Sequence, residues 1–259
     1  MLKGFDEGAI GYIVPAECME GGKELGSRLS ESIEKLPKKR TSYNRNGTGA
    51  DRGLKYSRMY TVWATYANEP RESGNFKDDG EVAEWFVEEM EPLWIKASDI
   101  LGNILPRVHK DCSVTQLPED LRRKAGVWMG MAVNIGSRDY PVATKPHRDV
   151  NSAKYGLSCL CALGNFKGGE VILWDLQVIV VLQPGDLFFF PDHLIIHSNM
   201  EVTDGVRHSV VASTRKDICN WQNNTRKRPF TDYREENAKV RKERDAKKRK
   251  EKGRQGKTG

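Results

Sequence analysis

The feature that most constrains the fold is a change of hydrophobic period near residue 126. From there, short β-rich runs follow one another, and turn residues such as Gly, Pro, Asn and Asp separate them. The runs are VWMGMAVNI, YGLSCLCAL, GEVILW, QVIVVL, DLFFF, LIIHS and RHSVVAS. No crossover helix fits between them, which disfavours a parallel α/β sheet. We therefore predict a sandwich or jelly-roll barrel over residues 126–217.

Helical patterns are confined to the first 125 residues. Apolar residues at helical spacing predict one helix over 24–36 and a longer one over 80–101, kinked or broken at Pro92. Residues 37–58 are basic, rich in Gly and Asn and without a period, so we expect a loop there. The predicted fold class is α+β: a double-stranded β-helix, or cupin-like jelly roll, with N-terminal helices packed on it.

The charge is unevenly distributed along the chain. The 259 residues include 42 Lys and Arg against 36 Asp and Glu, a net charge of +6. Residues 226–259 hold 15 basic and 6 acidic residues, which leaves 27 basic and 30 acidic residues in 1–225. We expect a single, slightly acidic domain over 1–225. The strongly basic segment 226–259 has almost no apolar residues, so we expect it to be a disordered tail.

The cysteines and the N-terminus indicate an intracellular location. Five scattered cysteines without a Cys-x-x-Cys pair make a disulfide framework or a zinc knuckle improbable. The N-terminus lacks the features of a signal peptide, and no apolar run approaches the roughly 20 residues that a membrane helix needs. Basic clusters such as Lys247–Lys250 are typical of nuclear import or nucleic-acid binding. We expect a nuclear protein without membrane attachment.

Candidate metal ligands lie in the segment ATKPHRDVN. His147 and Asp149 are two residues apart, so in an extended chain the imidazole and the carboxylate project to the same side. A second histidine would complete a two-histidine, one-carboxylate set, which favours non-haem Fe(II) with positions open for oxygen and a co-substrate. His193, His197 and His208 are the candidates for that histidine.

The order of motifs after this point resembles the 2-oxoglutarate/Fe(II)-dependent dioxygenases. The family's pattern is His-x-Asp, a Gly-Gly strand start, a Pro-Gly-Asp turn into an aromatic strand, a distal His, and a basic residue about ten positions later. This chain has His-Arg-Asp at 147–149, Gly-Gly-Glu at 168–170 and Pro-Gly-Asp-Leu-Phe-Phe-Phe at 184–190. His197 is followed by Arg207 at the family's spacing, so His197 is favoured as the distal histidine.

The other two histidines fit the pattern less well. His193 lacks a basic residue at the required spacing, and His208 is adjacent to Arg207 and would point to the opposite face of its strand. By resemblance, His147, Asp149 and His197 hold Fe(II), with 2-oxoglutarate as co-substrate and O2 as oxidant.

The resemblance also implies how 2-oxoglutarate is bound. Its distal carboxylate should pair with the planar guanidinium of Arg207, and the Ser209 hydroxyl should assist because it lies two residues further on the same strand. Asn134, on the strand before the metal-binding segment, is a candidate for lining the co-substrate site. The reaction implied is oxidative decarboxylation of 2-oxoglutarate to succinate and CO2, coupled to oxidation of a substrate.

Within this superfamily, the sequence most resembles the ten-eleven-translocation/J-binding-protein group, especially its short fungal-type members. The residues that carry the resemblance are Val150-Asn151 directly after the His-Arg-Asp motif, GLSCLCALGNFKGGEVILWDLQ, PGDLFFF and LIIHSN. The resemblance implies oxidation of 5-methylcytosine in DNA to 5-hydroxymethylcytosine and further products. The enzyme would have to flip the base out of the duplex. Asn151 is a candidate for reading the edge of that base.

Methylated DNA is therefore the expected partner, bound at the active site and by the basic tail. The segment 38–60, where Lys and Arg alternate with Tyr43, Tyr56 and Tyr60, is a second candidate for DNA contact. One alternative is the same chemistry on a protein side chain or small molecule, which the slightly acidic body favours. Another is an inactive jelly roll that binds nucleic acid, against which the intact metal and arginine motifs argue. The sequence indicates no protein partner.

Overall fold

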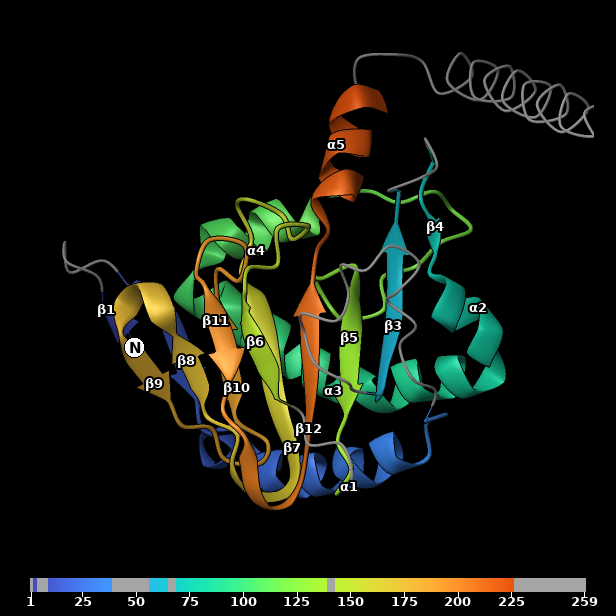
Figure 1. Cartoon of the computed structure of the whole chain (residues 1–259). Helices are drawn as coiled ribbons and strands as arrows, with labels where there is room; N and C mark the ends of the chain where they lie inside the picture. The colour runs from blue at the N-terminus through green and yellow to red at the C-terminus, as the bar shows by residue number, and fades with distance from the viewer. Residues whose placement is uncertain (1, 4–8, 39–55, 65–68, 139–142, 226–259) are drawn as a thin grey trace, which may run out of the picture.

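The fold consists of two antiparallel sheets with helices packed on the larger one (Figure 1). A computed structural model describes residues 2–3, 9–38, 56–64, 69–138 and 143–225. The large sheet has the strand order β1-β2-β10-β7-β12-β5-β3-β4, and the small sheet has the order β6-β11-β8-β9. This arrangement confirms the predicted α+β jelly roll with N-terminal helices.

All seven predicted β-rich runs contain a strand. The large sheet comprises β1 (Leu2–Lys3), β2 (Ala9–Val14), β3 (Tyr56–Trp63), β4 (Arg71–Glu72), β5 (Gly130–Ile135), β7 (Ser158–Gly168), β10 (Leu187–Phe190) and β12 (Val202–Ser213). The small sheet comprises β6 (Thr144–His147), β8 (Val171–Leu173), β9 (Val178–Val180) and β11 (His197–Asn199). The β6 strand ends at His147, one of the predicted metal ligands.

The helices lie mainly on one side of the large sheet. They are α1 (Gly22–Glu34), α2 (Gly74–Asp79), α3 (Glu81–Ile104), α4 (Pro106–Ser113) and α5 (Lys216–Thr225), with short 3-10 turns at η1 (Ala16–Cys18) and η3 (Trp174–Leu176). Of the kink or break predicted at Pro92, the break is wrong, because α3 continues through this residue. Proline removes one backbone hydrogen bond, and the buried face of α3, which includes Met90 and Trp94, offsets that loss. None of the described helices combines the length and apolar character needed to cross a bilayer.

Two strands from the N-terminal part join the large sheet. The β2 strand pairs with β10, and β3 pairs with β5. Residues 1–125, predicted as a helical part, therefore also contribute strands, and the helix α5 lies beyond residue 125, where no helix was predicted. The predicted loop over 37–58 also overlaps β3, while residues 39–55 lie outside the described part of the chain. The basic composition of this region hid a strand in which Tyr60 and Val62 are buried on one face.

The predicted DNA-contacting segment 38–60 contains two residues that belong to the interior. Arg58 is buried, and its Nε lies 2.8 Å from Asp79 Oδ2. The hydroxyl of Tyr60 donates to the same oxygen at 2.8 Å. These two side chains stabilise the contact between β3 and α2, so the prediction is wrong for them. Tyr43 and the basic tail lie outside the described residues.

The two faces of the large sheet have different partners because side chains alternate along each strand. Residues such as Cys161, Phe189 and Val210 pack in one cluster with the helices. The opposite, inner face contributes Leu160, Ala162, Phe188 and Phe190 to a second cluster, in which they pack against Val171 and Leu173 of the small sheet. Arg207 and Ser209 pair with Gly164 and Ala162, so they lie on the inner face.

Candidate metal centre

The structure brings His147, Asp149 and His197 together at the small sheet. His147 of β6 and His197 of β11 pair directly, and their ring centroids are 4.4 Å apart. Asp149 follows β6 by two residues, and its Oδ2 lies 3.8 Å from His197 Nε2. One ligand atom from each residue lies within 4.8 Å of the others. The three residues can therefore hold a metal ion between two neutral nitrogens and a carboxylate.

Both histidines are oriented by the backbone. His147 Nδ1 lies 2.8 Å from the carbonyl oxygen of Lys145, and His197 Nδ1 lies 2.9 Å from that of Ile195. A carbonyl oxygen can only accept, so Nδ1 carries the proton in each ring and Nε2 presents its lone pair. The ring of Phe190 packs edge-on against His197, with centroids 5.1 Å apart. These contacts preset the two imidazoles for metal binding.

The two alternative histidines lie outside this cluster. His208 is buried on the outer face of β12, where its Nε2 lies 3.0 Å from Glu34 and its Nδ1 accepts from the backbone N–H of Gly136 at 3.1 Å. An unprotonated Nδ1 and a burial-lowered pKa both indicate a neutral imidazole. His193 is adjacent to Asp192 in the turn before β11, and burial lowers its pKa as well.

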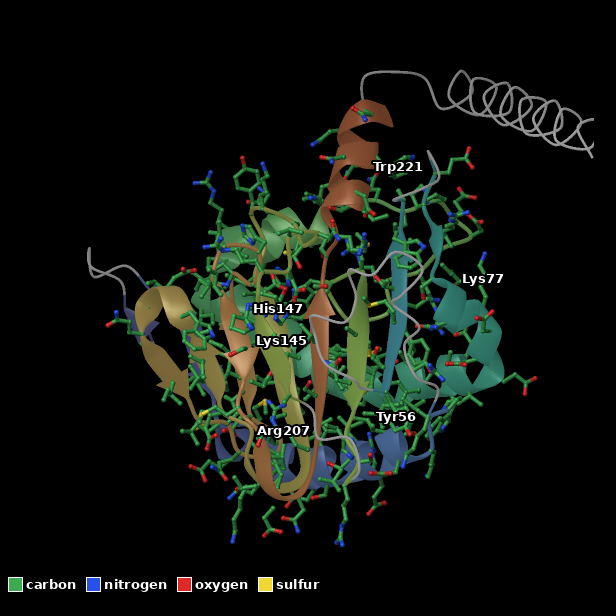
Figure 2. The ribbon with its side chains drawn as sticks, viewed as in Figure 1. Tyr56, Lys77, Lys145, His147, Arg207 and Trp221 are labelled. Atoms are coloured by element: carbon green, nitrogen blue, oxygen red, sulfur yellow. The ribbon has the colours of Figure 1, made fainter. Side chains whose placement is uncertain are left out.

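Arg207 is a buried charge on the inner face of the large sheet. Its exposed fraction is 1%, and its guanidinium nitrogens have no hydrogen-bond partner among the residues that the structure describes. Burial lowers its pKa to about 10, which leaves it positively charged at neutral pH. A buried charge without a partner is costly, so this site fits an anionic ligand such as a carboxylate. Figure 2 labels His147, on β6 of the small sheet, and Arg207, on β12 of the large sheet, with Arg207 lower in the view.

A glycine makes room beside Arg207. A Cβ atom on Gly169 would lie 2.6 Å from Arg207 Cδ, so a larger residue there would displace the arginine side chain. Gly169 also has a φ of +72°, which favours glycine. The ring of Phe166 lies 5.5 Å from the guanidinium carbon, a cation–π contact. The Gly-Gly motif found in the sequence therefore shapes the surroundings of Arg207.

The remaining predicted site residues fall into two places. Asn134 and Ser209 are paired across β5 and β12 on the face that carries Arg207, and Asn134 Nδ2 donates to Ser209 Oγ at 3.0 Å. Asn151 lies apart from them, exposed on the loop after Asp149, where its backbone oxygen accepts from Lys216 N–H at 2.8 Å.

Sequence reasoning missed two residues that connect the ligand-bearing segments. Arg148 donates to the carbonyl of Leu194 at 2.6 Å and to Asp175 Oδ2 at 3.1 Å. Asp192 is buried, and its backbone oxygen accepts from Asp149 N–H at 3.0 Å. Burial and the nearby charge of Asp149 raise the pKa of Asp192 to about 7. The sequence offered one signal for each residue. Arg148 lies inside the His-x-Asp motif, and Asp192 follows the aromatic strand by two residues.

A jelly roll with this metal-ligand cluster and a buried arginine on its inner face defines the class of 2-oxoglutarate/Fe(II)-dependent oxygenases. The model of the Tet_JBP family, the oxygenase domain of the 2OGFeDO superfamily, matches residues 60–216, more than half of the chain. The protein belongs to this TET/JBP oxygenase family. Membership makes it an oxidoreductase and implies Fe(II) and 2-oxoglutarate, which the donor set and Arg207 fit.

The chain is similar to several solved structures, and the one with a TM-score above 0.5 shows the same fold. NgTET1 from Naegleria, in complex with 5mC DNA, is 20% identical with a TM-score of 0.63, over 82% of this chain and 75% of that chain. An oxidoreductase of the 2OG-Fe(II) oxygenase family from Burkholderia pseudomallei is 15% identical with a TM-score of 0.47, over 80% and 89% of the two chains. The viral collagen prolyl hydroxylase vCPH from Paramecium Bursaria Chlorella virus-1 is 12% identical with a TM-score of 0.45, over 82% and 99%. A search of curated proteins gave no match.

Proposed function

We propose that the protein oxidises methylated bases in DNA, converting 5-methylcytosine to 5-hydroxymethylcytosine and further products. The observation that carries this proposal is the match to the TET/JBP family over residues 60–216, with the metal-ligand cluster complete. NgTET1, which shares the fold, was solved with 5mC DNA. The proposal extends that substrate class to this chain.

Each site residue has a role in the proposed reaction. His147, Asp149 and His197 hold Fe(II) through two Nε2 atoms and a carboxylate oxygen. Arg207, assisted by Ser209, pairs with the distal carboxylate of 2-oxoglutarate, and Asn134 positions the Ser209 hydroxyl by its hydrogen bond. When bound, iron and 2-oxoglutarate supply an oxidation in which one atom of O2 enters succinate and the other enters the substrate.

Exposed apolar side chains next to the metal ligands support a macromolecular substrate. Val150 is 59% exposed directly after Asp149, Tyr155 is 85% exposed on the same loop, and Leu194 is 60% exposed on the segment before His197. The two segments are tied together, because Arg148 donates to the carbonyl of Leu194. Exposed apolar residues gathered around a site indicate a contact surface, and an exposed tyrosine can stack on a nucleobase.

The charges on these segments favour an anionic partner. Lys154 is exposed between Val150 and Tyr155, and Lys216 donates from its ammonium group to the carbonyl of Val150 at 2.7 Å. Three nearby acidic groups are neutralised or hidden: Asp175 pairs with Arg148, Asp217 pairs with Arg215, and Asp192 is buried. Lysines without an ion pair among the described residues, beside exposed apolar groups, suit a phosphate backbone and an unstacked base. A flipped base would reach the metal past Asn151, which we propose reads its edge.

The test is to incubate the full-length protein with Fe(II), 2-oxoglutarate and duplex DNA containing 5-methylcytosine, and then to analyse the nucleosides by mass spectrometry. We expect 5-hydroxymethylcytosine from the wild type and none from the Asp149→Ala variant. Succinate formation in the presence of a peptide or small molecule, without any oxidised base, would exclude DNA as the substrate. It would leave the proposed oxygenase chemistry intact.

We further propose that residues 1–225 form one catalytic domain and that 226–259 serve as a basic DNA-binding tail and nuclear-targeting segment. Deleting 226–259 should weaken DNA binding at low salt and flatten its salt dependence, because fewer phosphate counterions are released. The turnover of 2-oxoglutarate should be unchanged. Loss of that turnover in the truncated protein would show that the tail belongs to the catalytic domain.

A further inference from the structure

Asp192 lies where the two ligand-bearing segments meet. It follows β10 by two residues and precedes His197 by five, and its exposed fraction is 1%. Its backbone oxygen accepts from the N–H of Asp149 at 3.0 Å. Asp192 is thus hydrogen-bonded to the proposed ligand Asp149 and lies on the same short segment as the proposed ligand His197.

The Asp192 carboxylate adds a second connection through two serines. Its Oδ2 accepts from Ser152 Oγ at 3.0 Å and from Ser158 Oγ at 2.6 Å. Ser152 belongs to the turn that begins at Asp149, because its N–H donates to the Asp149 carbonyl at 2.8 Å. Ser158 is the first residue of β7, in the large sheet. Through these two hydrogen bonds, the carboxylate connects the loop after Asp149 to the large sheet.

A second buried carboxylate provides a natural comparison. Asp186 stands at the other end of β10 and is 6% exposed. Its two oxygens accept from the N–H groups of Ala16 and Gln183, each at 2.8 Å. Both carboxylates accept two hydrogen bonds in the interior, but the partners of Asp186 belong to η1 and to the turn before β10. Only Asp192 bonds to a segment that carries a metal ligand.

We propose that Asp192 is a positioning residue of the metal centre: its carboxylate holds the loop after Asp149 so that the Asp149 carboxylate faces His197. The role rests on the proposed metal site but not on the proposed DNA substrate. Groups that orient metal ligands typically contribute about ten- to a hundredfold to metal affinity. A carboxylate that only stabilised the fold, as we infer for Asp186, would contribute nothing specific to metal affinity.

The test is to titrate Co(II) into the full-length, metal-free protein and to follow metal binding by the visible absorption of the bound ion. Asp192→Ala should weaken Co(II) binding by about tenfold or more. Asp192→Asn should weaken it less, because the amide oxygen can still accept both serine hydroxyls. The matched control Asp186→Ala should lower the unfolding temperature yet keep the Co(II) affinity within about twofold of the wild type.

A second variant covers the case in which Asp192→Ala does not fold. The double variant Ser152→Ala/Ser158→Ala removes the same two hydrogen bonds while retaining the carboxylate, and it should also weaken Co(II) binding. Wild-type affinity in folded Asp192→Ala, or an equal loss in Asp186→Ala, would overturn the positioning role alone. A wild-type protein that binds no Co(II) would overturn the metal centre, and the proposed function with it.

Discussion

Arg207 and His208 are neighbours on β12, yet they lie in opposite environments. His208 points to the outer face, where Glu34 and the backbone of Gly136 satisfy both of its ring nitrogens. Arg207 points to the inner face, where no described residue hydrogen-bonds to its guanidinium. Both side chains are buried.

We infer from this difference that the outer face around His208 serves stability and that the inner face around Arg207 serves a ligand. A buried polar group that contributes to the fold has its partners within the protein, as His208 does. A buried charge without a hydrogen-bond partner among the described residues costs stability, so we infer that a ligand supplies the partner of Arg207. The same inner face joins the small sheet through Phe188, Phe190 and the aromatic contact with His197, so the proposed anion site and the proposed metal site belong to one region.

The largest effect is expected at the metal ligands of the inner region. Asp149→Ala and His197→Ala should reduce 2-oxoglutarate turnover to background, because each removes one of the three proposed metal ligands. His193→Ala is the matched control, since His193 lies near the ligands but outside their cluster. Succinate formation, measured with the three variants, tests this ligand assignment. Full turnover in His197→Ala, or its loss in His193→Ala, would contradict the ligand assignment.

On the outer face, His208→Ala should destabilise the fold by about 1–3 kcal/mol, because the N–H of Gly136 loses its acceptor. Urea unfolding measures this change.

Burial lowers the pKa of His208, so below about pH 6.5 the unfolded chain binds the proton more readily and the wild type loses stability. The variant should lack this part of the pH dependence. An unchanged Michaelis constant for 2-oxoglutarate is expected, and a large increase would show that the two faces are coupled.

A smaller effect is expected from Ser209→Ala. Losing one hydroxyl hydrogen bond, worth about 0.5–1.5 kcal/mol, should raise the Michaelis constant for 2-oxoglutarate about two- to tenfold with little change in kcat. Ser213→Ala on the same strand serves as the control, because Ser213 is four residues from Ser209 and pairs with Gly130 instead of Asn134. Steady-state kinetics of both variants give the comparison. Equal Michaelis constants for Ser209→Ala and the wild type would show that Ser209 does not contribute to 2-oxoglutarate binding.

The smallest change is expected for the stability of Arg207→Met in the absence of ligands. Replacing an uncompensated buried charge with an apolar side chain of similar length should leave the free energy of unfolding unchanged or raise it. This is the opposite sign to His208→Ala. Urea unfolding of the metal-free protein tests it, and a loss as large as that of His208→Ala would mean that Arg207 has structural partners.

Much of this arrangement could be predicted from the sequence, because local rules determine it. Alternation along a strand placed Arg207 and Ser209 together and His208 opposite, and turn residues separated the strands of the jelly roll. Residue spacing was enough to favour His197. The strand β3 escaped prediction because its Arg58 is buried by an ion pair with Asp79, which composition does not reveal.

The part that the sequence could not predict depends on loops that meet only in the folded chain. Asp192 and Ser152 are 40 residues apart, and nothing local signals their hydrogen bond. Arg148 likewise contacts Leu194 across the two ligand-bearing segments. Such contacts follow from the pairing of β6 with β11, which the strand pattern alone does not specify.

The most direct test of the account is the affinity of 2-oxoglutarate for the wild type and for Arg207→Met. Isothermal titration of the full-length protein loaded with Mn(II), which avoids turnover, measures it. The account predicts clear binding to the wild type and at least about tenfold weaker binding to the variant, because a charge-assisted bidentate pair is lost. Equal affinities would contradict the claim that the buried Arg207 on the inner face binds 2-oxoglutarate.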